Sequence, residues 1–369
     1  MVFVRKRSRA AMTVENECQV DAWPHPAPAR NWAGVNSYFL HAFQEHNRTQ
    51  VLDAVQAANL KAIRIFISYT PENNKDTGSV YMPDIEPDVV GRYDDTQLKA
   101  IDQLMVEAHE RDIKLIITLH DRYQLGCWGN DTYVTKYDLP ALDCATGSAS
   151  ANDVTSWYKN PRAIRDFDNR IQHCLEHRNR FIRGSPKWKD LAEYIFAFDI
   201  QNEGQGHLNQ NIAPVPKWWC DRSRFMRSIM GRRSKVLIGT GGGNEFSNSD
   251  IPENWACDAI DLVGIHSYSA FDVFQSKVPL ALKHALKANK LTVLEEFGSM
   301  GAGKADTIEQ HVNFFNELGV PWLPWQISKP GYGEGNYEFW VDEPTYTVVK
   351  KGARKALQSP AKQKFWDMP

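Results

Sequence analysis

The segment Tyr194-Ile-Phe-Ala-Phe-Asp-Ile-Gln-Asn-Glu203 joins a short apolar run to a polar end. Apolar residues at nearly every position, without alternation, are typical of a parallel strand that is covered on both faces. The segment Leu291-Thr-Val-Leu-Glu-Glu296 has the same form. A carboxylate at the end of a buried strand is costly to keep charged unless it has a partner or a chemical task. The two segments therefore predict a buried parallel sheet with functional acids at its edge.

Further runs of this kind recur along the chain and alternate with helical patterns. The eight predicted strands are residues 33–38, 61–67, 113–120, 194–202, 235–240, 261–266, 291–296 and 322–327. The predicted helices are residues 50–59, 94–111, 164–180, 218–230, 280–288, 305–318 and 345–357, and the helix after the fifth strand is poorly marked. Eight alternating units predict an α/β fold, a single (β/α)8 TIM barrel rather than a doubly wound sheet.

The barrel domain is predicted to span residues 30–369. Residues 1–29 are polar and rich in proline, which predicts an irregular or disordered N-terminal extension. The longest insertion, about residues 122–160, follows the third strand and contains Cys127, Trp128 and Cys144. Loops after barrel strands shape the catalytic face, so we expect this loop insertion to border the site.

Composition narrows the class of partner. The 369 residues are 42% hydrophobic and 24% charged, with a net charge of -2, which gives no electrostatic case for nucleic acid or a membrane surface. No apolar stretch approaches the roughly 20 residues that a membrane helix needs. We expect a neutral partner, and no membrane or nucleic-acid binding.

The cysteines and the N-terminus bear on the compartment. Six cysteines and the sequons at Asn47 and Asn130 fit secretion, although residues 5–14 lack the apolar length of a signal peptide. Secretion is the prediction, and an intracellular location is the alternative. Cys127 and Cys144 could be joined within the insertion, with the other cysteines as free buried thiols.

The absence of C-x-x-C spacing argues against a zinc site, and the helical His173/His177 pair is interpreted as part of an amphipathic helix surface.

Polar or aromatic side chains follow seven of the eight predicted strands, at the barrel end where active sites form. These residues are Asn36, Arg64, His120, Asn202 with Glu203, His266 with Tyr268, Glu296 and Trp325. Two carboxyl groups about 5–5.5 Å apart can act as nucleophile and proton donor in retaining glycoside hydrolysis. Arg64 and Tyr268 are expected to hold Glu296 ionised, Asn202 to bind a sugar hydroxyl, and Trp325 to underlie a sugar ring.

These motifs resemble glycoside hydrolase family 5, the cellulase and endo-mannanase family, over about residues 31–350. The resemblance is carried by Gly34-Val-Asn36-Ser-Tyr38, Ile63-Arg64-Ile65, Leu119-His120, Gln201-Asn202-Glu203, His266-Ser-Tyr268, Glu296-Phe-Gly298 and Trp325-Gln-Ile-Ser. Within the family, Trp157-Tyr-Lys-Asn-Pro161 and Phe198-Asp-Ile-Gln-Asn-Glu203 are most similar to fungal and plant β-mannanases. The resemblance implies a retaining hydrolase with Glu203 as acid/base and Glu296 as nucleophile.

The implied enzyme is a monomer without metal or organic cofactor that acts on a β-linked polysaccharide or oligosaccharide, chiefly β-1,4-mannan, within the chain. An exo-acting β-glycosidase or transglycosylase is one alternative, and a non-catalytic glycan-binding barrel is another. The sequence leaves open which sugar is bound.

Several residues near the strand ends remain to be placed. Trp128 and Glu245 are further candidates for substrate contact, and Glu295 is expected to face the helix layer because neighbouring strand residues alternate in direction. Gly204 replaces the proline that usually follows the acid/base in the family, and Gly241-Gly-Gly243 also departs from the mannanase pattern. We interpret the triple glycine as a turn or a wall of the cleft.

Overall fold

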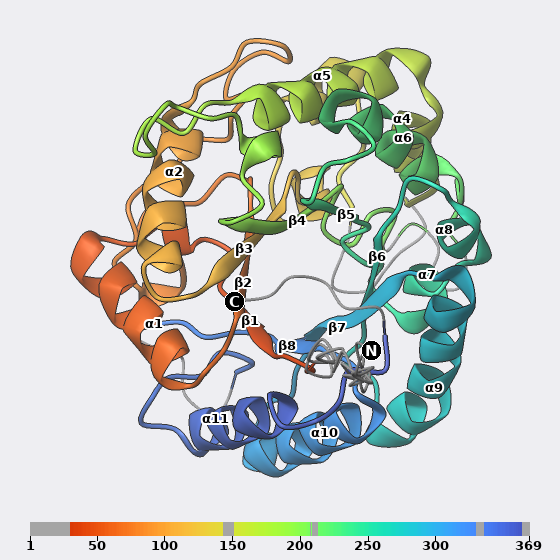
Figure 1. Ribbon diagram of the computed structural model, residues 1–369. Helices are drawn as coiled ribbons and strands as arrows, with labels where there is room; N and C mark the ends of the chain where they lie inside the picture. Colours follow the sequence, from red (N-terminus) through yellow and green to blue (C-terminus); the bar gives the residue numbers. More distant parts are fainter. Residues whose placement is uncertain (1–29, 143–150, 207, 209–212, 330–335, 364–369) are drawn as a thin grey trace, which may run out of the picture.

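The computed structural model describes residues 30–142, 151–206, 208, 213–329 and 336–363. Within these ranges, eight parallel strands lie in sequence order and helices surround them (Figure 1). The strands are β1 (Gly34–Asn36), β2 (Ala62–Phe66), β3 (Lys114–Thr118), β4 (Ile195–Asp199), β5 (Leu237–Gly239), β6 (Leu262–His266), β7 (Leu291–Phe297) and β8 (Trp322–Pro324). A parallel bridge between Ala33 and Trp322 links the first strand region to the last. The prediction of a (β/α)8 barrel is confirmed.

The longer helices form the outer layer of the barrel. They are α1 (Glu45–Ala57), α2 (Thr96–His109), α5 (Pro161–Glu176), α6 (Trp218–Met230), α9 (Phe271–Ala288), α10 (Lys304–Leu318) and α11 (Pro344–Ala356). All seven predicted helices are present. The start of α9 was predicted too late, at Leu280, because Pro279 inside the helix signals a break.

Short helices occupy the segments that sequence patterns left unassigned. The insertion after β3 carries α3 (Thr132–Tyr137) and α4 (Ala151–Lys159), and the segment after β5 carries α7 (Phe246–Ser249) and α8 (Pro252–Ala256). Helices of four to nine residues contain too few turns for a clear apolar periodicity. The predicted N-terminal extension, residues 1–29, lies outside the described residues.

The barrel interior has two layers. Its lower layer is apolar and contains Ala62, Ile116, Leu237 and Leu262, with Trp32 and Phe196 in edge-to-face contact, the six being members of one buried cluster. Further along the strands, toward their carboxyl ends, stand polar side chains, all buried: Arg64, Thr118, Asp199, His266, Glu295 and Glu296. Because alternate strand residues face the same side, the apolar floor places this polar layer at the carboxyl ends of the strands.

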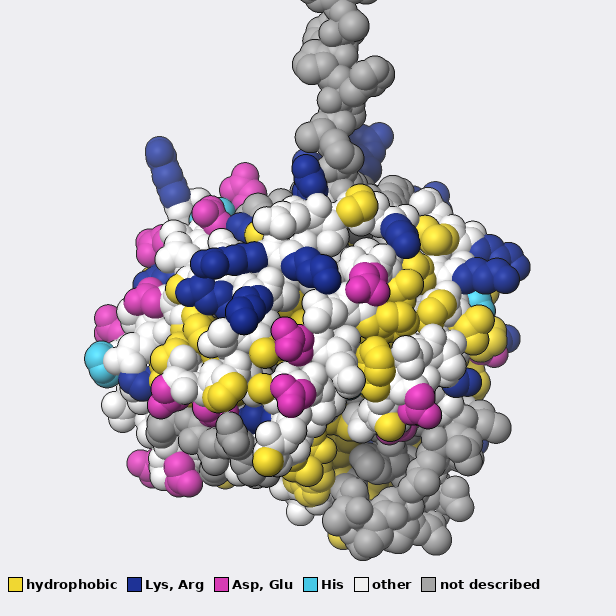
Figure 2. All heavy atoms as spheres, turned by 90° about the horizontal axis from the view of Figure 1, so that it is seen from below, with side chains coloured by type: hydrophobic (Ala, Val, Ile, Leu, Met, Phe, Trp, Pro, Cys, Tyr) yellow, Lys and Arg dark blue, Asp and Glu magenta, His cyan; other side chains and the backbone are white. Residues whose placement is uncertain are grey.

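The surface shows no large field of one charge on the face that Figure 2 displays. Basic and acidic side chains are interspersed there with apolar and uncharged ones (Figure 2). Among the described residues, no helix has both the length and the apolar character that crossing a membrane requires. The mixed surface agrees with the small net charge of the chain.

A disulfide joins two segments of the outer layer. Cys220 in α6 and Cys257 directly after α8 are bonded across 37 residues, so the expectation that they are free thiols was wrong. Their separation has no short-range signature, which is why sequence reasoning missed the pair. Cys174 is a buried free thiol, as expected. Cys127 is also disulfide-bonded, and its predicted partner Cys144 lies outside the described residues.

Replacing both Cys220 and Cys257 by serine should lower the free energy of unfolding by about 2–4 kcal/mol, because a cross-link over a loop of this size restricts the unfolded chain. Urea unfolding followed by tryptophan fluorescence measures the change under non-reducing conditions. A reducing agent should then destabilise the double variant less than the wild type. Equal unfolding midpoints for the two oxidised proteins would contradict a structural role for this bond.

Candidate active site

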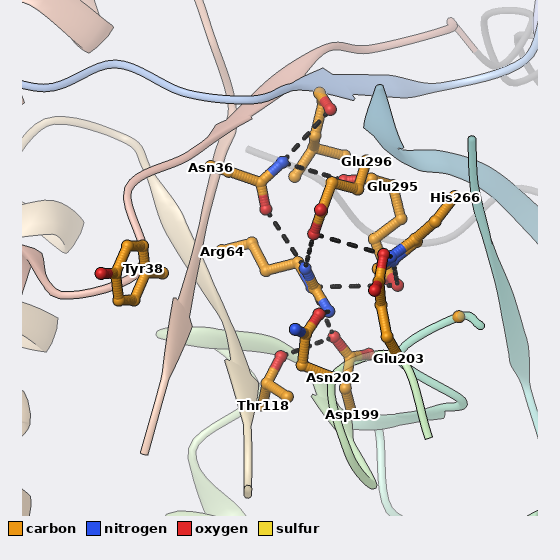
Figure 3. A network of polar contacts seen from close by, with 12 residues as sticks. Asn36, Tyr38, Arg64, Thr118, Asp199, Asn202, Glu203, His266, Glu295 and Glu296 are labelled. Carbon is orange, nitrogen blue, oxygen red and sulfur yellow. Dashed lines mark hydrogen bonds and ion pairs between the residues drawn. The ribbon is translucent and has the colours of Figure 1, made fainter. Parts of the chain in front are cut away.

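Arg64 on β2 lies at the centre of the polar layer and is fully buried (Figure 3). Its Nε donates to Asp199 Oδ2 at 2.9 Å and its Nη1 donates to Glu296 Oε2 at 3.0 Å. The same guanidinium donates to the side-chain oxygens of Asn36 at 3.3 Å and Asn202 at 3.0 Å. One cation therefore fixes side chains from β1, the end of β4 and β7 in a single arrangement.

Glu203, His266 and Glu296 form the open side of this network. One carboxylate oxygen from each glutamate and one His266 ring nitrogen all lie within 4.8 Å of one another. His266 Nδ1 lies 3.2 Å from Glu203 Oε1, and Tyr268 donates its hydroxyl to Glu296 Oε1 at 2.9 Å. Tyr123 donates its hydroxyl to Glu203 Oε2. The structure thus brings together two carboxylates that the sequence placed on separate strands.

Glu295 does not face the helix layer, and that expectation was wrong. Its side chain is fully buried inside the barrel, where Oε2 lies 3.2 Å from His266 Nε2 and 3.8 Å from Arg64 Nε. The reason is a register shift: Ile265 pairs with Leu294, but His266 pairs with Glu296. Glu295 is the extra residue of this irregularity, which interrupts the alternation of side chains along β7.

His120 and Asn202 belong to a supporting chain of contacts at the ends of β3 and β4. His120 Nδ1 accepts from Gln201 Nε2 at 3.0 Å, and its Nε2 lies 2.7 Å from Asp131 Oδ2. Asn202 donates to Asp121 Oδ1 at 3.0 Å while accepting from Arg64. His120 therefore anchors the loops around the site, and among the described residues its side chain makes no hydrogen bond or ion pair with Glu203 or Glu296.

Two aromatic stacks flank the glutamates. Trp325, partly buried, lies over Tyr38 with ring centroids 5.5 Å apart and planes inclined by 10°. On the insertion after β3, Trp128 stacks on Tyr123 with centroids 4.6 Å apart and planes inclined by 10°. Trp128 remains 72% exposed. Because Tyr123 contacts Glu203, the exposed face of Trp128 is available near the open side of the site.

Glu245 lies just before α7 and is held by the loop after β6. Its Oε2 accepts from the hydroxyl of Ser267 at 2.8 Å and from that of Ser269 at 3.2 Å. These contacts tie the loop after β5 to the loop that carries Tyr268. Whether Glu245 also contacts a ligand stays a prediction.

The glycine segments shape the wall beside Glu203. Glu203 itself has φ +45°, and its N–H donates to the carbonyl of Gly241 at 2.9 Å. Gly242 has φ +67°, and a Cβ there would lie only 2.4 Å from the His266 ring. The triple glycine is therefore a wall of the site, as predicted. The backbone at Glu203 is left-handed, and Gly204 follows it. A turn with proline after the glutamate cannot be assumed to have the same form.

Burial and nearby charges shift the ionisation of this cluster. Burial raises the pKa of Glu296 to about 7; His266, Arg64 and Tyr268 act to lower that pKa, whereas Glu203 acts to raise it. Burial acts to lower the pKa of His266, but Glu296, Glu203 and Glu295 outweigh it and raise the pKa to about 9. The imidazole is therefore charged near neutral pH.

The same three side chains offer donor atoms to a metal ion, but their protonation opposes binding. A metal needs the unprotonated nitrogen of a histidine, whereas the raised pKa keeps a proton on each ring nitrogen of His266 at neutral pH. Arg64 places a second positive charge beside Glu296. The arrangement is suited to proton transfer and to nucleophilic attack by a carboxylate.

Several residues of the site were not predicted from the sequence. Asp199 and Glu295 are buried carboxylates on Arg64, Tyr123 contacts Glu203, and Gly242 makes room for His266. Asp199 carried a detectable signal, since a charged residue inside the run 194–202 needs a partner within the barrel. The positions of Tyr123 and Gly242 depend on loop conformations that periodicity does not describe.

Comparisons with known proteins agree on one family. The sequence profile of the family described as Cellulase (glycosyl hydrolase family 5) matches residues 20–331. Mannan endo-1,4-beta-mannosidase 5 of Arabidopsis thaliana is 24% identical over 350 residues, covering 84% of this chain and 77% of that protein. Mannan endo-1,4-beta-mannosidase 2 of Oryza sativa subsp. japonica is 23% identical over 255 residues, covering 64% of this chain and 53% of that protein.

Solved structures show the same barrel. The endo-beta-1,4-mannanase from Thermotoga petrophila superposes with a TM-score of 0.67 at 16% identity, covering 92% of this chain and 79% of that one. The endo-1,4-beta-mannanase from Rhizomucor miehei gives a TM-score of 0.65 at 20% identity, covering 89% of this chain and 96% of that one. At these identities the likeness establishes the fold.

Conformational stability should fall as pH rises from about 4.5 to about 9. Glu296 and His266 bind protons more tightly when folded, with pKa values of about 7 and about 9, than in an unfolded chain, where they titrate near about 4.3 and about 6.5. Their stabilising contribution is complete below the unfolded pKa values and is lost as pH passes the folded ones. In Glu296→Gln the fall below pH 7 should be smaller.

Urea unfolding at pH 5, 6, 7 and 8 measures this dependence. Glu309→Gln, on the exposed side of α10, is the matched control and should follow the wild type. If Glu296→Gln loses as much stability between pH 5 and pH 7 as the wild type does, the raised pKa of Glu296 is refuted.

Proposed function

The chain belongs to glycosyl hydrolase family 5 and is a glycoside hydrolase, and from this premise we propose that it cleaves β-1,4-linked mannan within the polysaccharide chain. In this proposal Glu296 is the nucleophile and Glu203 is the acid/base. The observation that carries it is the close approach of the two carboxylates: one oxygen of each lies within 4.8 Å of one oxygen of the other, beside Arg64 and His266. Inverting enzymes separate their carboxyl groups by about 6.5–9.5 Å, so this spacing favours retention.

Hydrolysis then proceeds by two displacements. Glu296 attacks the anomeric carbon while the glycosidic C–O bond breaks and Glu203 gives its proton to the leaving oxygen. A glycosyl ester of Glu296 results. Glu203, now ionised, takes a proton from a water molecule whose oxygen attacks the same carbon. The ester bond breaks, Glu296 leaves as a carboxylate, and Glu203 is again protonated.

The neighbours of each glutamate suit these roles. Arg64 and Tyr268 donate to Glu296 and stabilise the carboxylate that must attack. Once Glu296 becomes an ester it loses its charge, which removes the repulsion that raises the proton affinity of Glu203. Glu203 can then remain ionised as a base. The coupling between the two acids thus supports the change of role between the two steps.

Support for the substrate comes from relatives and from the walls of the site. The plant relatives at 23–25% identity are named mannan endo-1,4-beta-mannosidases. Trp325 and the exposed Trp128 offer aromatic faces of the kind that stack on sugar rings. A small net charge suits a neutral glycan. We therefore assign a β-linked polysaccharide as partner, and mannan as its chemical identity.

Secretion is part of the proposal, supported by the disulfide between Cys220 and Cys257 and by the bonded state of Cys127. Disulfides persist in oxidising compartments and are rare in the cytosol. A monomeric state remains a prediction that sedimentation of the purified protein would test.

Glu203→Gln should lower kcat on mannan by about 10²–10⁴-fold, because the leaving oxygen loses its proton donor. Glu296→Ala should be inactive on mannan yet form an α-glycosyl azide from an activated aryl β-mannoside when azide is added. Glu176→Gln, on the outer face of α5, serves as the control with normal turnover. Unchanged hydrolysis by either site variant, or a first product of inverted configuration in the wild type, would overturn the assignment.

Product lengths test the mode of action separately. An endo-acting enzyme releases oligosaccharides of mixed length early in the reaction, whereas release of mannose alone from chain ends would replace our proposal by exo action. Parallel assays on β-glucan, xylan and galactan test the identity of the sugar.

Gly242→Ala should lower kcat by about 10- to 100-fold with a smaller effect on KM, because its Cβ would occupy the position of the His266 ring, 2.4 Å away, and displace a group next to both glutamates. Gly231→Ala is the matched control. Gly231 also has positive φ, at +81°, but a Cβ there meets nothing within 4 Å. Both variants carry backbone strain, so equal losses of activity would show that strain, and not the displacement of His266, is responsible.

A further inference from the structure

A second pair of carboxylates lies beneath Glu203 and Glu296. Asp199 is the last residue of β4, and Glu295 lies at the register shift of β7. Both are fully buried. Asp199 Oδ2 accepts from Arg64 Nε at 2.9 Å, and Glu295 Oε2 lies 3.8 Å from the same nitrogen. The two acids therefore face one side of a single guanidinium, whose other side holds Glu296 (Figure 3).

Each acid of this deeper pair has one oxygen without a donor. Asp199 Oδ1 and Glu295 Oε1 are buried and have no hydrogen-bond partner, although Thr118 donates to Asp199 Oδ2 at 3.0 Å. Glycines make room for both groups, since a Cβ at Gly239 would lie 2.3 Å from Asp199 Oδ1 and one at Gly264 would lie 2.0 Å from Glu295 Oε2. A buried ionised oxygen without a donor is costly, and a proton on the group removes that cost.

The charges around the site do not balance if every acid is ionised. Arg64 and His266 face four carboxyl groups: Glu203, Glu296, Asp199 and Glu295. The phenols nearby, Tyr123 and Tyr268, have raised pKa values and stay neutral, and burial also raises the pKa of Asp121. One proton belongs to the acid/base Glu203. A second proton on any of the other three acids would match two negative charges to two positive ones.

We propose that Asp199 and Glu295 carry one proton between them and act as positioning residues, holding Arg64 and His266 against Glu296 and Glu203. Burial and the facing charge of Glu295 raise the pKa of Asp199 to about 6, so the pair holds this proton below about pH 6. The inference rests on the proposed roles of Glu203 and Glu296. Neither member of the deeper pair touches the substrate in this scheme; both act through Arg64 and His266.

A shared proton makes the two acids substitutes for each other. When Glu295→Gln removes one acid, Asp199 loses its like-charged neighbour and ionises fully, so the total charge of the deeper pair stays at -1. In Asp199→Asn, Glu295 is the acid that remains, and it carries the single negative charge of the pair. Only the double variant removes the last negative charge, and the unbalanced Arg64 and His266 then favour the ionised form of Glu296.

The pH profile of kcat/KM distinguishes this scheme from one in which Asp199 and Glu295 titrate independently. Each single variant should leave the acidic limb within about 0.3 pH unit of the wild type, whereas the double variant should move it lower by about 1 unit or more. Glu86→Gln is the control, because Glu86 is a buried acid that faces Arg170 of α5 outside this network. Shifts that are equal in the singles and additive in the double would overturn the proposal.

Infrared difference spectra provide a readout that needs no substrate and no double variant. At pH 5, below the pKa of Asp199, the spectrum of wild type minus Glu295→Gln should show the loss of one protonated-carboxyl band, and so should the spectrum for Asp199→Asn. Glu86→Gln should retain that band. A band that survives in both single variants would refute the shared proton. Absence of turnover on every mannan by the wild type would instead refute the proposed function and leave the infrared result intact.

Discussion

The Arg64 guanidinium, fully buried among carboxylates, is the interaction on which the rest of the site depends. Its Nε donates to Asp199, its Nη1 donates to Glu296, and both acids are buried. Removing one partner from a buried ion pair is strongly destabilising, because the remaining charge is left uncompensated. The strands that carry these groups, β2, β4 and β7, must therefore keep their register for the charges to remain paired. Catalytic geometry and barrel integrity are in this way secured by the same contacts.

The architecture could be predicted from the sequence because each strand is largely apolar and does not alternate. Covered strands need no alternation, and their ends converge by topology, so the residues at those ends could be grouped before any coordinates were known. The prediction failed where helices are short or contain proline, as at Pro279 in α9. In such places tertiary packing, which the local pattern does not report, determines the conformation.

The residues that surround the two glutamates were mostly predicted, and the deeper acids Asp199 and Glu295 were missed. Glu203, Glu296, Arg64 and His266 lie together as their places after the strands implied. Glu295 was placed on the wrong side of the sheet because strict alternation was assumed across an irregular pairing with β6. An irregularity of one residue leaves no mark in composition or periodicity. It nevertheless brings two neighbouring glutamates to the same face, which an ideal strand could not do.

The apolar floor formed by Trp32, Phe196 and their neighbours has a consequence for how protons enter and leave. It closes the barrel below the acids, so exchange with solvent passes through the open end above them. A polysaccharide bound across that opening lies on this path. In the proposed mechanism, the water molecule that gives its proton to Glu203 must therefore enter beside the bound chain.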